Sequence, residues 1–119
     1  RQLVHSAWTI HATAAFVLWW VTNVHPFKNG NGRTARGLAF LILVCMRVVP
    51  AEVPCSAFHA AVRQRKSFFL RAFAEVDEAA GICECCSSSA VWPRSIPQEV
   101  FAPLVVLVKE LVQHLTARL

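Results

Sequence analysis

Apolar residues recur at steps of three and four residues over several stretches of the chain, which is the period of a helix with a buried face. The first stretch covers about residues 2–23, and Trp8, Trp19 and Trp20 widen its apolar surface until it almost encircles the helix. A helix that is apolar on most sides is typical of a central helix with several neighbours. The second stretch covers about residues 32–48 and is rich in leucine. Because a short polar segment joins the two, the pattern predicts a helical hairpin at the centre of the fold.

A connector and further helices follow the hairpin. Pro50 and Pro54 mark the connector, since proline cannot continue a helix. Ser67 is a predicted N-cap, and Gly81 is a predicted C-terminal stop. The remaining helices are predicted over residues 55–65, 67–80 and 103–117, with a loop over residues 82–94. The sequence shows no repeat and no strand pattern, so the predicted fold class is all-α, a helical bundle of about five helices.

The composition fits a single folded domain over residues 1–119. Hydrophobic residues make up 55% of the chain and charged residues 16%, which excludes a disordered chain. No apolar run reaches the roughly 20 residues that a membrane span needs, so we expect no membrane span. The chain starts at Arg1 without the pattern of a signal peptide, and we expect it to be an excerpt of a longer protein.

The balance of charge is basic, with a formal net charge of +5 from 12 basic and 7 acidic residues. Four basic residues cluster within residues 63–71, but they lack the aromatic interleaving of a nucleic-acid surface, so we expect a solvated helix face and no nucleic-acid partner. The five cysteines are odd in number and irregular in spacing, which argues against a disulfide framework and for a reducing, cytoplasmic compartment. Those within residues 83–86 lie too close together for one tetrahedral zinc site. Secretion into a host cell stays open.

The polar segment between the first two predicted helices, residues 24–36, reads VHPFKNGNGRTAR. Pro26 blocks continuation of the first helix because it lacks an N–H group. Gly30 and Gly32 flank Asn31, and these are the residue types that most easily adopt positive φ. A turn of this kind can point successive backbone N–H groups into one concavity, which predicts an anion-binding nest.

The residues after this turn extend the prediction to phosphates. The N-terminus of the next helix presents free N–H groups and the positive end of its dipole to the same place. Arg33 and Arg36 lie on one side of its first turn, where two cations are unfavourable unless an anion lies between them. A lone Gly-Asn-Gly turn or a His-Pro helix stop would be structural. With His25 and the two arginines, we interpret the segment as a polyphosphate cradle with a histidine at its edge.

The same residues carry a resemblance to a known family. The chain reads His25-Pro26-Phe27-x-x-Gly30-Asn31-Gly32-Arg33-x-x-Arg36, and this resembles the HPFx(D/E)GNGRxxR signature of Fic (Fido) domains. Asn29 stands where most members carry Asp or Glu. Residues 63–80 resemble the family's later helix, with its basic-aromatic start and acidic end, so the resemblance covers about residues 5–80. It implies a Fic-like core around the central helix-loop-helix.

The resemblance implies a protein adenylyltransferase, a nucleotidyltransferase that transfers AMP from ATP to a Ser, Thr or Tyr hydroxyl of a target protein (AMPylation). His25 is then the catalytic residue, because an imidazole can accept the proton of the attacking hydroxyl. The implied nucleotide-binding residues are Lys28, Asn29, Gly30, Asn31, Gly32, Arg33 and Arg36. The glycine nest and the Asn31 amide would stabilise the transferring phosphate, and Arg33 and Arg36 would hold the outer phosphates.

The implied structural anchor of the motif is Phe27. We expect its ring to fill the space between the two helices of the hairpin and so to fix the loop that carries His25. If the ring is buried, Phe27→Ala is expected to cost roughly 3–5 kcal/mol of stability and to reduce activity.

ATP is the implied substrate and Mg²⁺ the implied cofactor, held in the family by the acidic residue at position 29. Asn29 offers only a neutral carbonyl oxygen, whereas Mg²⁺ favours anionic oxygen. This leaves open a weaker metal site with retained activity, a changed nucleotide orientation and a degenerate enzyme. The alternatives to AMPylation are therefore the transfer of a terminal phosphate to a protein, as in the Doc branch, and a catalytically degenerate Fic-like module that binds a nucleotide or a protein. A structural bundle with a residual motif is the third.

The resemblance also implies partners besides the target protein. Many members carry an inhibitory helix whose Glu pairs with the second motif arginine, so an inhibitory helix or an antitoxin is an implied partner. The nearest match here is Ser95-x-x-x-Glu99, where Val100 replaces a small residue, so a helix start explains it better. The β-hairpin flap that aligns the target peptide in the family is not found in this sequence.

Overall fold

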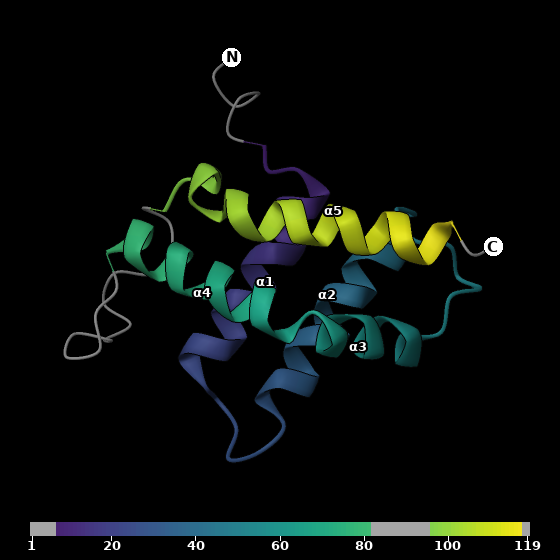
Figure 1. Ribbon diagram of the computed structural model, residues 1–119, viewed down its shortest axis with the longest axis horizontal. Helices are drawn as coiled ribbons and strands as arrows, with labels where there is room; N and C mark the ends of the chain where they lie inside the picture. Colours follow the sequence, from purple (N-terminus) through teal and green to yellow (C-terminus); the bar gives the residue numbers. More distant parts are fainter. Residues whose placement is uncertain (1–6, 82–95, 118–119) are drawn as a thin grey trace.

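The computed structural model describes residues 7–81 and 96–117, and within these ranges the chain is all-helical (Figure 1). The helices are α1 (Ile10–Val24), α2 (Asn31–Cys45), α3 (Cys55–Gln64), α4 (Lys66–Ala80), the short 3₁₀ helix η4 (Gln98–Phe101) and α5 (Ala102–Thr116). The predicted fold class, an all-α bundle of about five helices, is thereby confirmed. None of the helices in the described ranges has the length and apolar character needed to cross a bilayer.

α1 is the central helix that its apolar surface predicts, although it is shorter than expected. It begins at Ile10 because Thr9 caps it, the Thr9 hydroxyl accepting a hydrogen bond from the Ala12 N–H at 3.1 Å. Trp19 is fully buried, and its indole Nε1–H donates to Asp77 Oδ1 on α4 at 2.7 Å. α1 is therefore tied to α4 by a polar contact within the core, and its position is fixed relative to the later helices.

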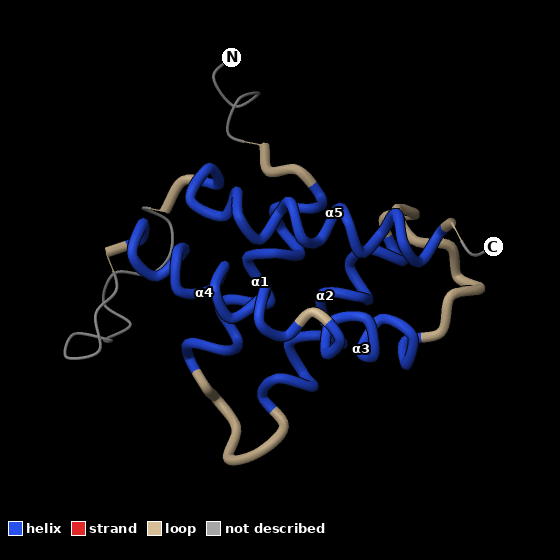
Figure 2. The backbone as a smooth tube through the Cα atoms, in the orientation of Figure 1, coloured by secondary structure: helices blue, strands red, loops and turns tan. Residues whose placement is uncertain are grey.

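α1 and α2 form the predicted hairpin. Small side chains are buried along both helices, Ala14 and Ala15 on α1 and Ala35 and Ala39 on α2, and such residues let two helices approach closely. The α1–α2 loop projects from the side of the molecule away from α5 (Figure 2). The hairpin thus carries the motif on a loop at one end of the bundle.

α2 ends at Cys45, before the predicted boundary at residue 48. Arg47 adopts a left-handed φ of 64°, and the Val48 N–H bonds to the Leu43 carbonyl at 2.8 Å. The Arg47 N–H bonds to the Val44 carbonyl at 2.9 Å. These two bonds make a Schellman motif, which stops a helix by satisfying its last carbonyls. The apolar pattern continues past this point, so it predicts too long a helix.

α3 and α4 follow the connector that Pro50 and Pro54 mark, and only Arg65 separates them. The predicted N-cap at Ser67 is wrong: α4 begins at Lys66, and no side chain caps it. It starts so early because the chain barely leaves the helical conformation at Arg65, whose carbonyl accepts the Phe69 N–H at 3.0 Å. The predicted stop at Gly81 is confirmed, with φ 77° and its N–H on the Glu78 carbonyl at 3.1 Å.

α5 packs on α1, α3 and α4 and closes the bundle. Phe101, immediately before α5, is fully buried and meets the Trp19 ring edge-to-face with centroids 5.3 Å apart. Cys45 and Cys55 are exposed free thiols. The predicted loop over residues 82–94, the cysteines at 83–86 and Ser95 lie outside the described residues.

Candidate functional site

The loop from α1 to α2 begins at His25, which turns the chain out of α1. His25 adopts the left-handed region at φ 54° and ψ 54°, and its N–H still bonds to the Val21 carbonyl at 3.0 Å. Pro26 follows and cannot donate the next helical hydrogen bond. The side chain of His25 is exposed, so its imidazole lies on the surface of the loop and not in the core. This is the placement that a group exchanging protons with a substrate requires.

The loop is held shut by Asn31, the first residue of α2. Asn31 is 7% exposed and is the one buried polar side chain among the residues that the structure describes. Its Oδ1 accepts the Phe27 N–H at 2.9 Å, and its Nδ2 donates to the Phe27 carbonyl at 2.7 Å. This closed pair of bonds fixes the five residues from 27 to 31 as a rigid turn. The Asn31 amide is thus used inside the loop, and its expected role as a donor to phosphate is not supported by this geometry.

Phe27 anchors the motif in a different way from the one its apolar ring predicts. The ring is 50% exposed, so the expectation of a buried plug between the helices is wrong. The anchoring groups are the backbone N–H and carbonyl of Phe27, which Asn31 binds. The exposed ring lies two positions after His25 in the sequence and is accessible to a ligand or a partner.

The N-terminus of α2 is open. Gly30 is the N-cap residue at φ 80°, as a positive-φ turn requires, but Gly32 is helical, so the predicted two-glycine nest is only half correct. The first helical hydrogen bond runs from the Thr34 N–H to the Gly30 carbonyl at 2.9 Å, so the N–H groups of residues 31–33 precede the ladder. No side chain caps this end, and its first turn contains no acidic residue. An open positive helix end of this kind favours a bound anion.

Gly32 makes room for Arg36. A Cβ atom on Gly32 would lie 3.1 Å from Arg36 Nη1, so the guanidinium folds back over the Cα of Gly32. Its Nε–H donates to Nδ1 of His59, on α3, at 2.9 Å. The side chain of Arg36, which belongs to α2, therefore extends from the first turn of α2 to α3. Gly32 is needed here for space and not for its φ angle.

The hydrogen-bonded pair of Arg36 and His59 and the two arginines whose charges act on both form what we call the basic cluster: Arg33, Arg36, His59 and Arg63. Burial lowers the pKa of Arg36, and the charges of Arg63 and Arg33 lower it further. Burial likewise lowers the pKa of His59, followed in effect by the charge of Arg36. Every charged neighbour that shifts these two groups is basic. The cluster is thus a region of positive potential suited to a polyanion.

The sequence pattern did not identify His59 and Arg63 as site residues. Arg63 was assigned to a solvated helix face, and His59 received no role. The available signal was their spacing: residues four apart on a helix share a face, and both are basic. The pairing of His59 with Arg36 spans 23 residues and depends on how α3 packs against α2.

Lys28 and Asn29 lie at the exposed tip of the loop. Neither supplies a carboxylate, and the first turn of α2 has none. No group of three His, Cys, Asp or Glu residues that could hold a metal ion occurs in the described ranges. Because Mg²⁺ prefers carboxylate oxygens among protein ligands, the donors of this loop do not fit a magnesium ion held by the protein.

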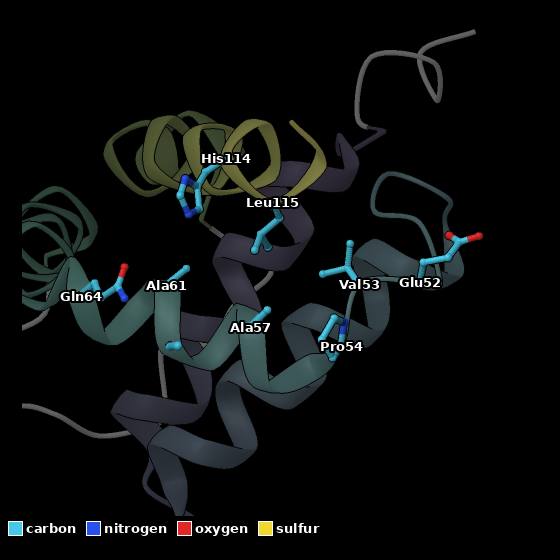
Figure 3. Close-up of a pocket in the computed structure, with 9 residues that line it drawn as sticks. Glu52, Val53, Pro54, Ala57, Ala61, Gln64, His114 and Leu115 are labelled. Carbon is cyan, nitrogen blue, oxygen red and sulfur yellow. The ribbon is translucent and has the colours of Figure 1, made fainter. Parts of the chain in front are cut away.

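A pocket of about 310 Å³ lies elsewhere, between α3 and α5 (Figure 3). Ala57 and Ala61 of α3 face His114 and Leu115 of α5 across it, and no motif residue lines it. The pocket and the basic cluster therefore use different faces of α3.

The nearest match to an inhibitory motif, which ends at Glu99, also lies elsewhere. Glu99 belongs to η4, which packs on α1, α4 and α5, and it is exposed. The hydrogen-bond partner of Arg36 is His59. Glu99 lies in the first turn of η4, in agreement with the interpretation of this segment as a helix start.

Comparison with known proteins finds a family whose sequences are similar to this loop and its two helices. Residues 3–43 match the model of the Fic/DOC family, and the matched segment contains the whole motif. The match covers about a third of the chain and confirms the predicted resemblance of this segment to Fic (Fido) domains. Comparison with curated proteins and with solved structures gave no match. The family match ends before α3, so His59 and Arg63 lie outside it.

Proposed function

We propose that this chain binds the phosphates of ATP at the N-terminus of α2 and transfers AMP to a hydroxyl group of a target protein. The observation that carries the proposal is the open start of α2, without a side-chain cap or an acidic residue in its first turn, beside Arg36 and His59, whose pKa values are shifted by basic neighbours. The family match supports AMPylation or a related phosphotransfer. The exposed His25 on a locked loop supplies the group that such a reaction needs.

The chemistry follows from this arrangement. His25 accepts the proton of the Ser, Thr or Tyr hydroxyl as its oxygen attacks the α-phosphorus of ATP. A new P–O bond joins AMP to the target, the bond to the β-phosphate oxygen breaks, and pyrophosphate leaves with that electron pair. The N–H groups of residues 31–33 stabilise charge on the α-phosphate. Arg33 and Arg36 neutralise the departing pyrophosphate.

Magnesium does not enter these steps as a protein-bound ion, because the donors of the loop do not fit one. Asn29 is the motif position where a metal would be expected, and its carbonyl is a weak ligand compared with a carboxylate. The roles above are therefore assigned to the residues of the chain alone.

Asn29 favours a second candidate function. With no carboxylate at this position, the same site would bind a nucleotide without turning it over, as a module that presents it to a protein partner. Transfer of the terminal phosphate, as in the Doc branch, is a third outcome that uses the same residues. An antitoxin or an inhibitory helix would regulate any of the three.

The deciding experiment is incubation of the chain and candidate target proteins with ATP labelled at either the α- or the γ-phosphate. AMPylation transfers only the α-label and phosphotransfer only the γ-label, and intact-mass analysis separates the two products. His25→Ala is expected to reduce transfer roughly 10²–10⁴-fold. His114→Ala, on α5 at the other pocket, is the matched control and should leave transfer unchanged. Transfer that persists in His25→Ala would overturn the assignment.

Binding without transfer is tested separately. ATP should raise the unfolding temperature of the chain, because a ligand that binds only the folded state stabilises it. Arg33→Ala should abolish this protection. Protection without transfer would favour the binding module over the enzyme.

A further inference from the structure

We propose that α3 completes the phosphate site, with His59 positioning the Arg36 guanidinium and Arg63 binding the terminal phosphates of the nucleotide. The identification of the anion as a nucleotide rests on the proposed function. The contribution of α3 goes beyond the motif and beyond the segment that matches the family. It predicts a site that prefers di- and triphosphates to monophosphates.

The first argument is the hydrogen bond from Arg36 Nε–H to His59 Nδ1 at 2.9 Å. A guanidinium has five N–H donors, and this bond uses the one on Nε. The four donors on the two terminal nitrogens remain for a ligand, and they have the fork geometry that binds phosphate oxygens in pairs. His59 thus fixes the direction of the fork without competing for it.

The second argument is the position of Arg63. It lies one helical turn after His59, so both side chains leave the same face of α3. Its charge acts on both His59 and Arg36, which places it within electrostatic range of both. Arg33 acts on the same two groups from α2. The charges of Arg33 on α2 and Arg63 on α3 therefore both act on the Arg36–His59 pair.

The third argument is charge balance. Like charges brought together by folding repel each other, and the charged neighbours that shift the pKa of the two partly buried members of the basic cluster, Arg36 and His59, are all basic. A triphosphate relieves this repulsion more than a monophosphate does, because it carries more negative charge over a longer span. The simplest competing explanation is that Arg63 is a solvated surface arginine, and the experiment below distinguishes the two.

His59 meets the requirement for an acceptor. Its Nδ1 accepts a hydrogen bond only when the imidazole is neutral, and burial together with the nearby guanidiniums lowers its pKa. The charged groups that face it are Arg33 and Arg36 from α2 and Arg63 from α3. A bound triphosphate would offset these charges and raise the His59 pKa again.

The experiment measures the affinities of ATP, AMP and inorganic tripolyphosphate for the chain by calorimetry. Arg63→Gln is compared with Arg47→Gln, which removes the same charge beyond the other end of α2. We expect Arg63→Gln to weaken ATP and tripolyphosphate about tenfold and AMP less than about twofold, with Arg47→Gln close to the wild type. Equal affinities in the two variants would overturn the role of Arg63.

The positioning role of His59 is tested by a measurement that would not change if His59 only stabilised the fold. His59→Leu removes the acceptor and should weaken ATP severalfold, whereas His59→Asn replaces Nδ1 by an amide oxygen and should restore most of the affinity. NMR titration of His59 should show its pKa rising with tripolyphosphate and much less with AMP. Equal ATP affinities of His59→Leu and His59→Asn, or a His59 pKa that does not change with tripolyphosphate, would overturn the positioning role of His59.

These outcomes separate the inference from the proposed function. If the α3 variants bind ATP as the wild type does while His25-dependent transfer continues, α3 has no part in the site and the proposed function stands. If tripolyphosphate binds with the expected variant effects but no transfer occurs, the α3 site stands and the enzyme assignment fails. If the wild type binds neither ATP nor tripolyphosphate, both are overturned.

Discussion

The two ends of α2 differ in whether their terminal backbone groups have hydrogen-bond partners within the chain. At the C-terminal end, Arg47 turns left-handed and the N–H groups of Val48 and Val49 both bond to the Leu43 carbonyl. At the N-terminal end, Gly30 turns left-handed, but no side chain caps the helix and the N–H groups of residues 31–33 precede the first helical bond. One end is closed by the chain itself, and the other is left for a ligand.

The arginines sharpen this contrast. Arg47, at the closed end, lies where the helix dipole favours a positive charge. Arg33 and Arg36, at the open end, lie where the dipole disfavours one, and Arg63 adds a further charge from α3. Basic residues at the favourable end stabilise the helix, whereas basic residues at the unfavourable end indicate that a negatively charged ligand is expected there.

The largest effect is expected from removing the Asn31 side chain, which holds the loop before α2. Asn31→Ala removes both bonds to the Phe27 backbone and should destabilise the fold by about 1–3 kcal/mol, with loss of ATP protection. Phe27→Ala is the matched control, because it removes an exposed ring and keeps both backbone bonds; it should cost less than about 1 kcal/mol. Urea unfolding measures both. A larger loss of stability in Phe27→Ala than in Asn31→Ala would contradict the role of the two Asn31 bonds in holding the loop.

The two left-handed residues allow a direct comparison of the ends. Gly30→Ala forces a side chain into φ 80° and should destabilise the fold by about 1 kcal/mol. Arg47→Gly removes the strain of a non-glycine residue at φ 64° at the closed end and should leave stability unchanged or raise it slightly. The gain is small because glycine also increases the conformational entropy of the unfolded chain. Thermal unfolding should show a lower unfolding temperature for Gly30→Ala and no decrease for Arg47→Gly. A stabilising Gly30→Ala would show that this turn is not under strain.

A substitution at Asn29 tests whether the lack of a carboxylate at the start of α2 limits activity. Asn29→Asp adds a carboxylate beside the phosphate site and should increase magnesium-dependent turnover severalfold, because Mg²⁺ prefers an anionic oxygen. The measurement is the transfer rate across a magnesium titration, with Lys28→Gln as a control for the change in loop charge. An unchanged magnesium dependence would show that position 29 does not limit the reaction.

Gly32→Ala separates binding from stability at the open end. The added methyl group would meet Arg36 Nη1 at 3.1 Å and displace the guanidinium, so ATP affinity should fall a few-fold. Stability should hold or rise by up to about 1 kcal/mol, because alanine favours a helix more than glycine does. Calorimetry and urea unfolding on the same sample check the two effects. Unchanged ATP affinity would mean that Arg36 adjusts without loss.

The smallest effect is a pH dependence of stability. The pKa values of His59 and His11 are lowered from 6.5 in the folded state, His11 by burial and then by the charge of Lys109. The unfolded chain therefore binds more protons than the folded chain just below this value, so stability should fall as the pH drops below 6.5. The unfolding temperature between pH 8 and pH 5 measures this. A His11→Asn, His59→Asn double variant should show a weaker slope, and an unchanged slope would assign the effect to other groups.

The sequence by itself determined the features that depend on neighbouring residues. Pro26 and Gly30 set the turn because their allowed φ angles act within the loop, and Gly81 ends α4 for the same reason. The apolar period predicted the helices because it repeats along each one. The motif residues identified the candidate site because they are close in sequence.

Only the tertiary structure decided the features that depend on how helices pack. Phe27 is apolar yet half exposed, because the space between α1 and α2 is closed by small side chains and by the Asn31 bonds. His59 joins the site because α3 packs against α2 and brings Nδ1 to Arg36 across 23 residues. Local preferences act over about four residues, whereas such contacts depend on the positions of whole helices in the bundle.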